Sequence, residues 1–153
     1  MKKIIFAAML CTFAIAAKAQ YGTINAILQR LEEKRGMNQN LEDVNIDNSK
    51  FILIKEFDDH TERDFIIING LKATYVEVFD DKQTGKSSSN VFSGDIIRSR
   101  KNIISLRADF LEGQKIGLPI TKNLLMTKQK KILYLVDINT RERWIEESAI
   151  NKK

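Results

Sequence analysis

The chain has one cysteine, one proline and one histidine among 153 residues. The cysteine, Cys11, lies in an apolar run near the N-terminus, so a chain cleaved after that run forms no disulfide even in an oxidising compartment. No thiol then remains to act as a catalytic nucleophile or as a zinc ligand. The fold therefore has to rest on the burial of apolar side chains.

Long hydrophobic runs are also missing, except for one at the start of the chain. Two lysines follow Met1, the run Ile4–Ala17 is almost entirely apolar, and small residues lie at the positions that signal peptidase reads before it cuts after Ala19. The run has about 14 residues, fewer than the roughly 20 that a membrane-spanning helix needs. We therefore expect a signal peptide over 1–19, cleavage between Ala19 and Gln20, and no stable membrane span afterwards.

Two details of this leader bear on where the protein resides. A lipoprotein would require modification of Cys11, but Leu10 stands where that processing needs a small side chain. The segment Ala17–Gln20 resembles the end of signal peptides from Gram-negative bacteria. We therefore expect a periplasmic or secreted protein, with a retained anchor or a lipid-modified cysteine as the alternative.

Nucleic-acid binding is not expected, although the whole chain has a formal charge of +5. Three of the 25 basic residues lie in the signal, which leaves 22 against 20 acidic ones and a net charge of +2. The charges are unevenly distributed, because residues 20–81 have a net charge of −6 and residues 82–153 one of +8. Such polarity suits binding to another protein, although the two halves could equally mix on one ordinary surface.

Residues 20–153 have the length of a single domain and contain no linker-like tract. Their first segment, about 23–35, has apolar residues at the i, i+3, i+4 and i+7 positions of a helix, and Gly36 can end that helix. We predict an amphipathic helix that packs over the protein's own sheet through Ile27 and Leu31, with a helix that faces a partner or a membrane surface as the alternative.

From Phe51 onward, runs of β-branched and aromatic residues alternate with short polar breaks. Asn69-Gly70 suits a tight hairpin turn, Gly94 a bulge and Gly113 a turn. Spacers this short cannot hold crossover helices, so we expect a mainly β fold, an antiparallel meander that forms either a small barrel or a half-open sheet. The runs predict about eight strands, at 51–57, 65–68, 73–79, 91–98, 102–110, 116–126, 131–138 and 141–145.

The alternation of side chains along these strands identifies the expected core. Because the first two strands are apolar on both faces, we expect the N-terminal helix to cover them from outside. The predicted core residues are Phe51, Leu53, Ile66, Ile68, Val76, Val78, Ile104, Leu106, Leu133 and Leu135.

Two polar segments are candidates for chemistry. Asp58, His60 and Glu62 alternate and could offer metal ligands, but a transition-metal site needs three or four converging ligands and the chain has no second histidine. The gap Asp80–Ser89 contains a Gly-Lys-Ser step without the first glycine of a phosphate-binding loop. We interpret both segments as solvated loops and expect no metal and no cofactor.

A basic turn is the candidate interaction surface. Arg98, Arg100 and Lys101, with Arg107 nearby, could bind a carboxylate or a phosphate through bidentate guanidinium contacts. Charged residues at a turn also serve as ordinary protection of a strand edge, so this interpretation competes with the first one.

The chain contains neither a G-x-S-x-G motif nor, after cleavage, a cysteine nucleophile. The leading hypothesis is a non-enzymatic envelope protein that binds another protein, as an interaction or accessory module. The alternative is a lipocalin-like carrier of a small apolar molecule, because the strand plan broadly resembles small calycin-like barrels. A hydrolase that uses paired carboxylates comes third.

Overall fold

The computed structural model of the chain describes residues 39–99 and 102–150. The expected signal peptide, its cleavage site between Ala19 and Gln20, and the expected helix over 23–35 lie outside the described residues. Within the described part, no helix is long and apolar enough to cross a membrane. The elements are β1 (Ser49–Glu56), β2 (His60–Asn69), β3 (Lys72–Asp81), β4 (Ser87–Ser99), β5 (Ile103–Leu111), β6 (Gln114–Gln129), β7 (Ile132–Asp137), β8 (Arg143–Glu146) and the short helix α2 (Glu147–Ile150).

The eight strands form one closed antiparallel barrel, in which each strand pairs with the next in the chain and β8 returns to β1. Of the two predicted architectures, the barrel is therefore confirmed. The closing seam is short, because within the described residues β1 and β8 pair at two positions, Phe51 with Glu146 and Ile52 with Ile145.

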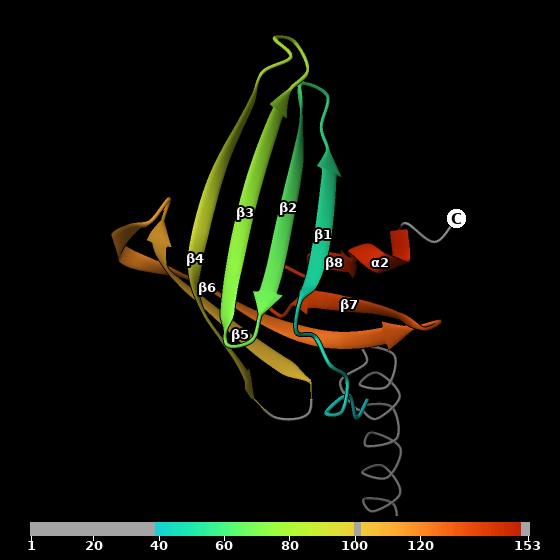
Figure 1. Ribbon diagram of the computed structural model, residues 1–153. Helices are drawn as coiled ribbons and strands as arrows, with labels where there is room; N and C mark the ends of the chain where they lie inside the picture. The colour runs from blue at the N-terminus through green and yellow to red at the C-terminus, as the bar shows by residue number, and fades with distance from the viewer. Residues whose placement is uncertain (1–38, 100–101, 151–153) are drawn as a thin grey trace, which may run out of the picture. The chain divides into compact units, whose positions relative to one another are not determined.

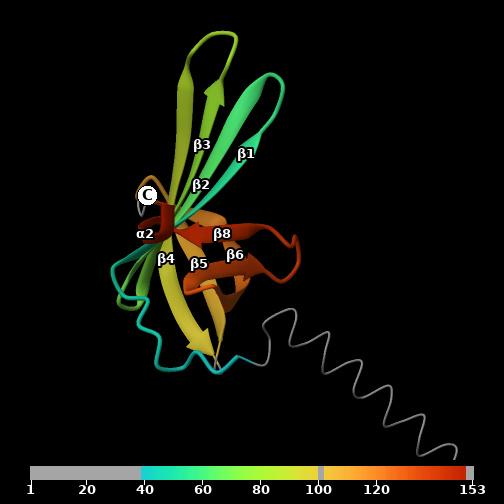
Figure 2. The ribbon, with the colours of Figure 1, turned by 90° about the vertical axis from the view of Figure 1, so that its right-hand side faces the viewer.

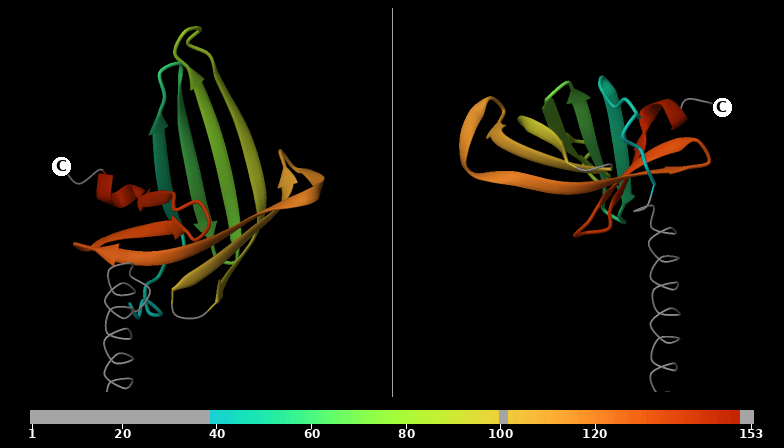
Figure 3. Two further views of the ribbon diagram at one scale, coloured as in Figure 1. Left: turned by 180° about the vertical axis from the view of Figure 1, so that it is seen from behind. Right: turned by 90° about the horizontal axis from the view of Figure 1, so that it is seen from below.

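Four strands extend beyond the closed part of the barrel. Within the described residues, β4 pairs with β5 from Phe92 onward, and β1 leaves β8 after Ile52 (Figure 1). Figure 2 shows the β1–β2 and β3–β4 hairpins rising above β5, β6 and β8. Seen from behind and from below, the 16-residue strand β6 crosses underneath these hairpins (Figure 3). We call the extending ends, residues 53–64 and 77–91, the projecting sheet.

The strands of the projecting sheet are longer than predicted. β2 begins at His60 rather than at Phe65, β3 continues to Asp81, and β4 begins at Ser87, inside segments expected to be loops. His60 and Asp81 themselves form a ladder pair. Backbone hydrogen bonds do not depend on the side chain, so polar residues continue a ladder that an apolar pattern no longer marks. The helix α2 was not predicted either.

The hairpin turns were only partly visible in the sequence. In the β2–β3 turn the left-handed residue is Gly70, with φ of 61°, and Leu71 follows it, so the turn is centred one residue later than Asn69-Gly70. In the β6–β7 turn Lys130 and Lys131 have φ of 49° and 70°. Two consecutive positive φ angles are typical of a type I′ turn, which usually contains glycine, asparagine or aspartate.

Gly94 lies at a shift of register between β4 and β5, as predicted for a bulge. A Cβ atom at this position would lie 1.9 Å from the carbonyl oxygen of Arg107 and 2.6 Å from the Cα of Ala108. The two backbones approach so closely that only glycine fits here.

The core fills the closed part of the barrel, and Trp144, Phe51 and Leu135 are completely buried. Leu53 is half-buried against this core. Seven of the ten predicted core residues are buried: Phe51, Ile66, Ile68, Ile104, Leu106, Leu133 and Leu135.

The predicted orientation of β3 was wrong. Tyr75 is 2% exposed and Ala73 is 4% exposed, whereas Val76 and Val78 are half-exposed on the opposite face of the strand. The prediction assumed that the more apolar face of the strand points inward. In this strand the inward face also carries Glu77, because the interior of the projecting sheet is polar.

The segment before β1 closes one end of the barrel. Leu41 is 7% exposed and belongs to the core, and Val44 and Ile46 pack against that core. Arg98 of β4 donates hydrogen bonds to the carbonyl oxygens of Leu41 and Val44, the latter at 2.7 Å. These contacts fix the segment as the floor of the barrel.

Candidate functional site

The inward positions change from apolar to charged where the strands leave the closed barrel. On β2, the buried residues Ile68 and Ile66 are followed at the same period by Asp64 and Glu62. Side chains two residues apart point to the same face of a strand, so the four side chains line one surface. The charged residues therefore lie directly beyond the core, on the inner face of the projecting sheet.

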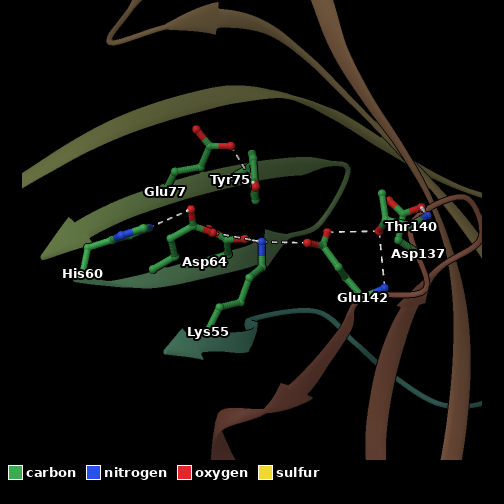
Figure 4. A network of polar contacts seen from close by, with 9 residues as sticks. Lys55, His60, Asp64, Tyr75, Glu77, Asp137, Thr140 and Glu142 are labelled. Carbon is green, nitrogen blue, oxygen red and sulfur yellow. Dashed lines mark hydrogen bonds and ion pairs between the residues drawn. The ribbon is translucent and has the colours of Figure 1, made fainter. Parts of the chain in front are cut away.

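The Lys55 ammonium is the centre of this polar interior (Figure 4). Its Nζ lies 2.6 Å from Glu142 Oε1, 3.2 Å from Glu62 Oε2 and 3.6 Å from Asp64 Oδ2. Burial alone would lower the pKa of Lys55, but the hydrogen bonds to Glu142 and Glu62 outweigh it and raise that pKa above its ordinary value. Lys55 therefore stays charged and ties β1 and β2 to the turn that precedes β8.

The pKa values of two carboxyl groups around Lys55 are shifted in opposite directions. The Asp64 side chain is 8% exposed, and burial raises its pKa above the ordinary range despite the attraction of Lys55. Burial also acts to raise the pKa of Glu142, but hydrogen bonds from Lys55 and Thr140 outweigh it and lower that pKa. Within this cluster, it is therefore the ionisation of Asp64 that lowers the stability of the folded state.

Two buried aromatic rings, those of Tyr75 and Trp144, contact further charged side chains of this interior. The Tyr75 hydroxyl donates to Glu77 Oε1 at 3.0 Å, and burial raises the pKa of Tyr75, which keeps the hydroxyl protonated. Lys122 Nζ lies 4.6 Å from the ring centroid of Tyr75 and 5.2 Å from that of Trp144. Both rings therefore stabilise the ammonium by cation–π contact. The buried indole N–H of Trp144 has no acceptor among the described residues.

His60 lies on the same inner face near the end of the projecting sheet. Its Nδ1 is 2.6 Å from Asp59 Oδ1 and its Nε2 is 3.5 Å from Glu62 Oε1. The imidazole stacks on Phe57 with ring centroids 4.5 Å apart. The bond to Asp59 is the main reason why the pKa of His60 is raised, since it favours the protonated ring.

A pocket of about 620 Å³ opens beside His60. Phe79, a residue that is 38% exposed, supplies an aromatic wall. The Asp81 carboxylate accepts hydrogen bonds at 2.8 and 2.9 Å from the backbone N–H groups of the β3–β4 turn, and these bonds lower its pKa. The remaining lining residues are Asp59, Gln83, Thr84, Lys86, Ser87 and Ser88.

The opposite, outer face of β1–β4 carries a group of neighbouring apolar residues, with Arg63, Asp80 and Ser89 beside it. Ladder pairs place Ile52 beside Phe65, and Val76 lies between Phe65 and Val91. Ile54 is 53% exposed and Val91 37% exposed. We call this surface the outer apolar face, which consists of Ile52, Ile54, Phe65, Ile67, Val76, Val78 and Val91.

The fold places Arg98 and Arg107 of the predicted interaction surface on opposite sides of the barrel wall. Arg98 points inward to the floor carbonyls, whereas Arg107 lies on the outer side of β5 and forms an ion pair with Asp109 at 3.1 Å. Arg100 and Lys101 lie outside the described residues.

The alternating residues Asp58, His60 and Glu62 do not converge as a metal site. His60 and Glu62 share the inner face, but Asp58 lies in the turn before β2. Among residues 39–99 and 102–150, no group of three or more histidine, cysteine, aspartate or glutamate residues is arranged to hold a metal ion.

Sequence reasoning missed the polar interior built around Lys55, Asp64 and Glu77. A usable signal was the turn at residues 70–71, because counting outward from a two-residue turn pairs Tyr75 with the buried Ile66. That register turns Tyr75 and Glu77 inward.

Searches against protein-family models, curated proteins and solved structures found no match for this chain.

Proposed function

We propose that this protein is an exported, non-enzymatic envelope protein that binds another protein through its projecting sheet. The observation that carries the proposal is the outer apolar face, which continues from the closed part of the barrel onto the base of the projecting sheet at Ile54, Val78 and Val91. Strands with one face packed on a core usually alternate with polar outward residues. Contiguous apolar surface on a soluble protein more often marks a contact with a partner.

The alternative of a lipocalin-like carrier has weaker support. A carrier of an apolar molecule needs an enclosed apolar cavity. Phe51, Trp144 and Leu135 fill the closed part of the barrel with 0% exposure, so no water-sized space adjoins them. The interior beyond them is charged, which suits an apolar ligand poorly.

A carboxylate-based hydrolase also has weaker support. The pKa values of Asp64 and Glu142 are displaced in opposite directions, as those of an acid and a base would be. The Lys55 ammonium, however, contacts both carboxylates, at 3.6 and 2.6 Å, and so occupies the space where a substrate bond would have to lie.

Native mass spectrometry of the mature protein from its own cell envelope tests the proposal. We expect a stoichiometric second polypeptide. Ile54→Asp, on the outer apolar face, should abolish its retention, because it would bury a charge at the contact. Leu118→Asp is the matched control, since Leu118 is 86% exposed on β6, away from that face. A bare protein would contradict the proposal, and a small-molecule adduct would favour the carrier.

A further inference from the structure

Among the described residues, no strand pairs with the first half of β4 on the side that faces away from β3, and we call this side the free edge of β4. The carbonyl oxygen of Val91 accepts a hydrogen bond from the backbone N–H of Glu112 at 2.8 Å, so it points away from β3 toward β5. Alternate residues of a strand direct their N–H and C=O groups to the same side. The backbone groups of Ser87 and Ser89 therefore point to that side too, where the β4–β5 ladder of the described residues has not yet begun.

In the part of the chain that the structure describes, this edge lacks the usual protection against strand addition. Natural edges are blunted by charged side chains, proline or a covering element. The outer end of β1 has such protection, because it carries Lys55 and Glu56 and because Glu142 contacts Lys55 at 2.6 Å. Residues 87–90 of β4 are three serines and an asparagine, all exposed and uncharged.

We propose that the free edge of β4 binds an extended, basic peptide segment of the partner protein, which adds as a fifth strand to the projecting sheet. This inference rests on the proposed function and names the part of the partner that makes the contact. Backbone hydrogen bonds from Ser87 and Ser89 supply the affinity in such a mode, and pockets for alternate side chains supply the specificity.

The inner face of the projecting sheet selects a basic peptide. Ser88 pairs with Phe79 and Asn90 with Glu77, so the inward side chains of an added strand lie beside Ser88 and Asn90, with that ring and that carboxylate on the next strand beyond. A lysine or arginine reaching across Ser88 meets the exposed ring of Phe79 and the pocket carboxylates. An acidic side chain at the same position would be repelled.

Two capped heptapeptides serve as probes, one alternating threonine with lysine and the other threonine with glutamate. Each is titrated into the mature protein while amide resonances and amide exchange are followed by NMR. We expect the lysine peptide to bind with a Kd of about 1 mM or lower and to protect the amides of Ser87 and Ser89. The glutamate peptide should bind at least about tenfold more weakly.

Proline substitutions test the edge itself. Ser89→Pro removes an N–H that β3 does not use and blocks the edge, so it should abolish binding of the lysine peptide. Ser89→Thr is the matched control, because it keeps the N–H and should bind as the wild type does. If Ser89→Pro fails to fold, Ser87→Pro replaces it, because a strand's first residue tolerates proline.

The outcomes separate this inference from the proposed function. Absence of binding by the lysine peptide, equal binding of both peptides, or binding unaffected by the proline variant overturns the inference. A partner polypeptide that stays on Ser89→Pro in native mass spectrometry overturns it as well and leaves the proposed function standing. A doubled mass that this variant abolishes would identify a second copy of the chain as the occupant instead.

Discussion

The closed part of the barrel and the projecting sheet share four strands but have opposite interiors. On β2 the inward residue Ile66 is completely buried in the closed part, whereas two residues earlier Asp64 belongs to a charged cluster. Eight strands surround the first region and exclude water, while in the second the carboxylates, the buried Asp64 included, are compensated by the Lys55 ammonium. The same four strands therefore stabilise the fold in the closed part of the barrel and carry the proposed binding surface in the projecting sheet.

The largest expected effect comes from emptying the closed part. Trp144→Ala should lower the free energy of unfolding by about 4 kcal/mol, because it leaves a large cavity among fully buried side chains. Trp144→Phe should cost about 1 kcal/mol or less, since it keeps most of the ring volume and removes an unsatisfied N–H. Urea unfolding measures both, and equal costs would contradict this description of the core.

The charged interior should respond to the loss of its cation. Lys55→Met should lower the free energy of unfolding at pH 7 by about 3 kcal/mol, because Glu62, Asp64 and Glu142 lose their shared partner. Below about pH 4 the carboxyl groups become neutral and the cost should shrink. The control is Lys50→Met, whose pair with Glu147 is more exposed and should contribute about 0.5 kcal/mol or less.

Removing the buried charge of Asp64 should raise the free energy of unfolding at pH 7 rather than lower it. The raised pKa of Asp64 means that the wild type loses stability as the pH rises from the unfolded pKa through the folded one. Asp64→Asn lacks this loss, so it should be more stable than the wild type at pH 7, with the difference disappearing in acid. Denaturation at pH 3 and pH 7 measures this, and a variant that is destabilised only at neutral pH would contradict it.

The smallest effect concerns the end of the projecting sheet. Because the pKa of His60 is raised, its contribution to stability is fully present below the unfolded value of about 6.5 and is lost as the pH rises through the folded value. His60→Gln should remove this pH dependence and leave the closed part unchanged. An NMR titration of the imidazole gives the folded pKa, and a value below that of a free histidine would refute the contact with Asp59.

The strand plan was readable because eight β-branched runs were separated by short breaks, and the bulge at Gly94 was readable because only glycine permits so close an approach. The inward face of β3 could not be predicted in this way. Val76 and Glu77 lie on opposite faces, and taking the more apolar face as the inward one gives the wrong orientation. Closure into a barrel was not readable either. It depends on pairing between β1 and β8, strands that no local pattern connects.

The candidate site was less predictable than the fold. A lysine such as Lys55 on an alternating strand normally indicates the solvent side, and its three carboxylate partners come from β2 and from the turn before β8. Such a cluster exists only after the ring has closed. Arg98 illustrates the converse, because a residue expected on a binding surface instead holds the floor of the barrel.

The short seam between β1 and β8 also bears on the order of folding. Seven of the eight strand pairs join neighbours in the chain, whereas the seam joins the first strand to the last, with Phe51 beside Glu146 and Ile52 beside Ile145. Such a contact carries the largest loop-closure entropy of any strand pair in the barrel. The hairpins are therefore expected to form first and the ring to close last. The same seam is then the place where the native barrel opens most readily, at a lower free energy than global unfolding.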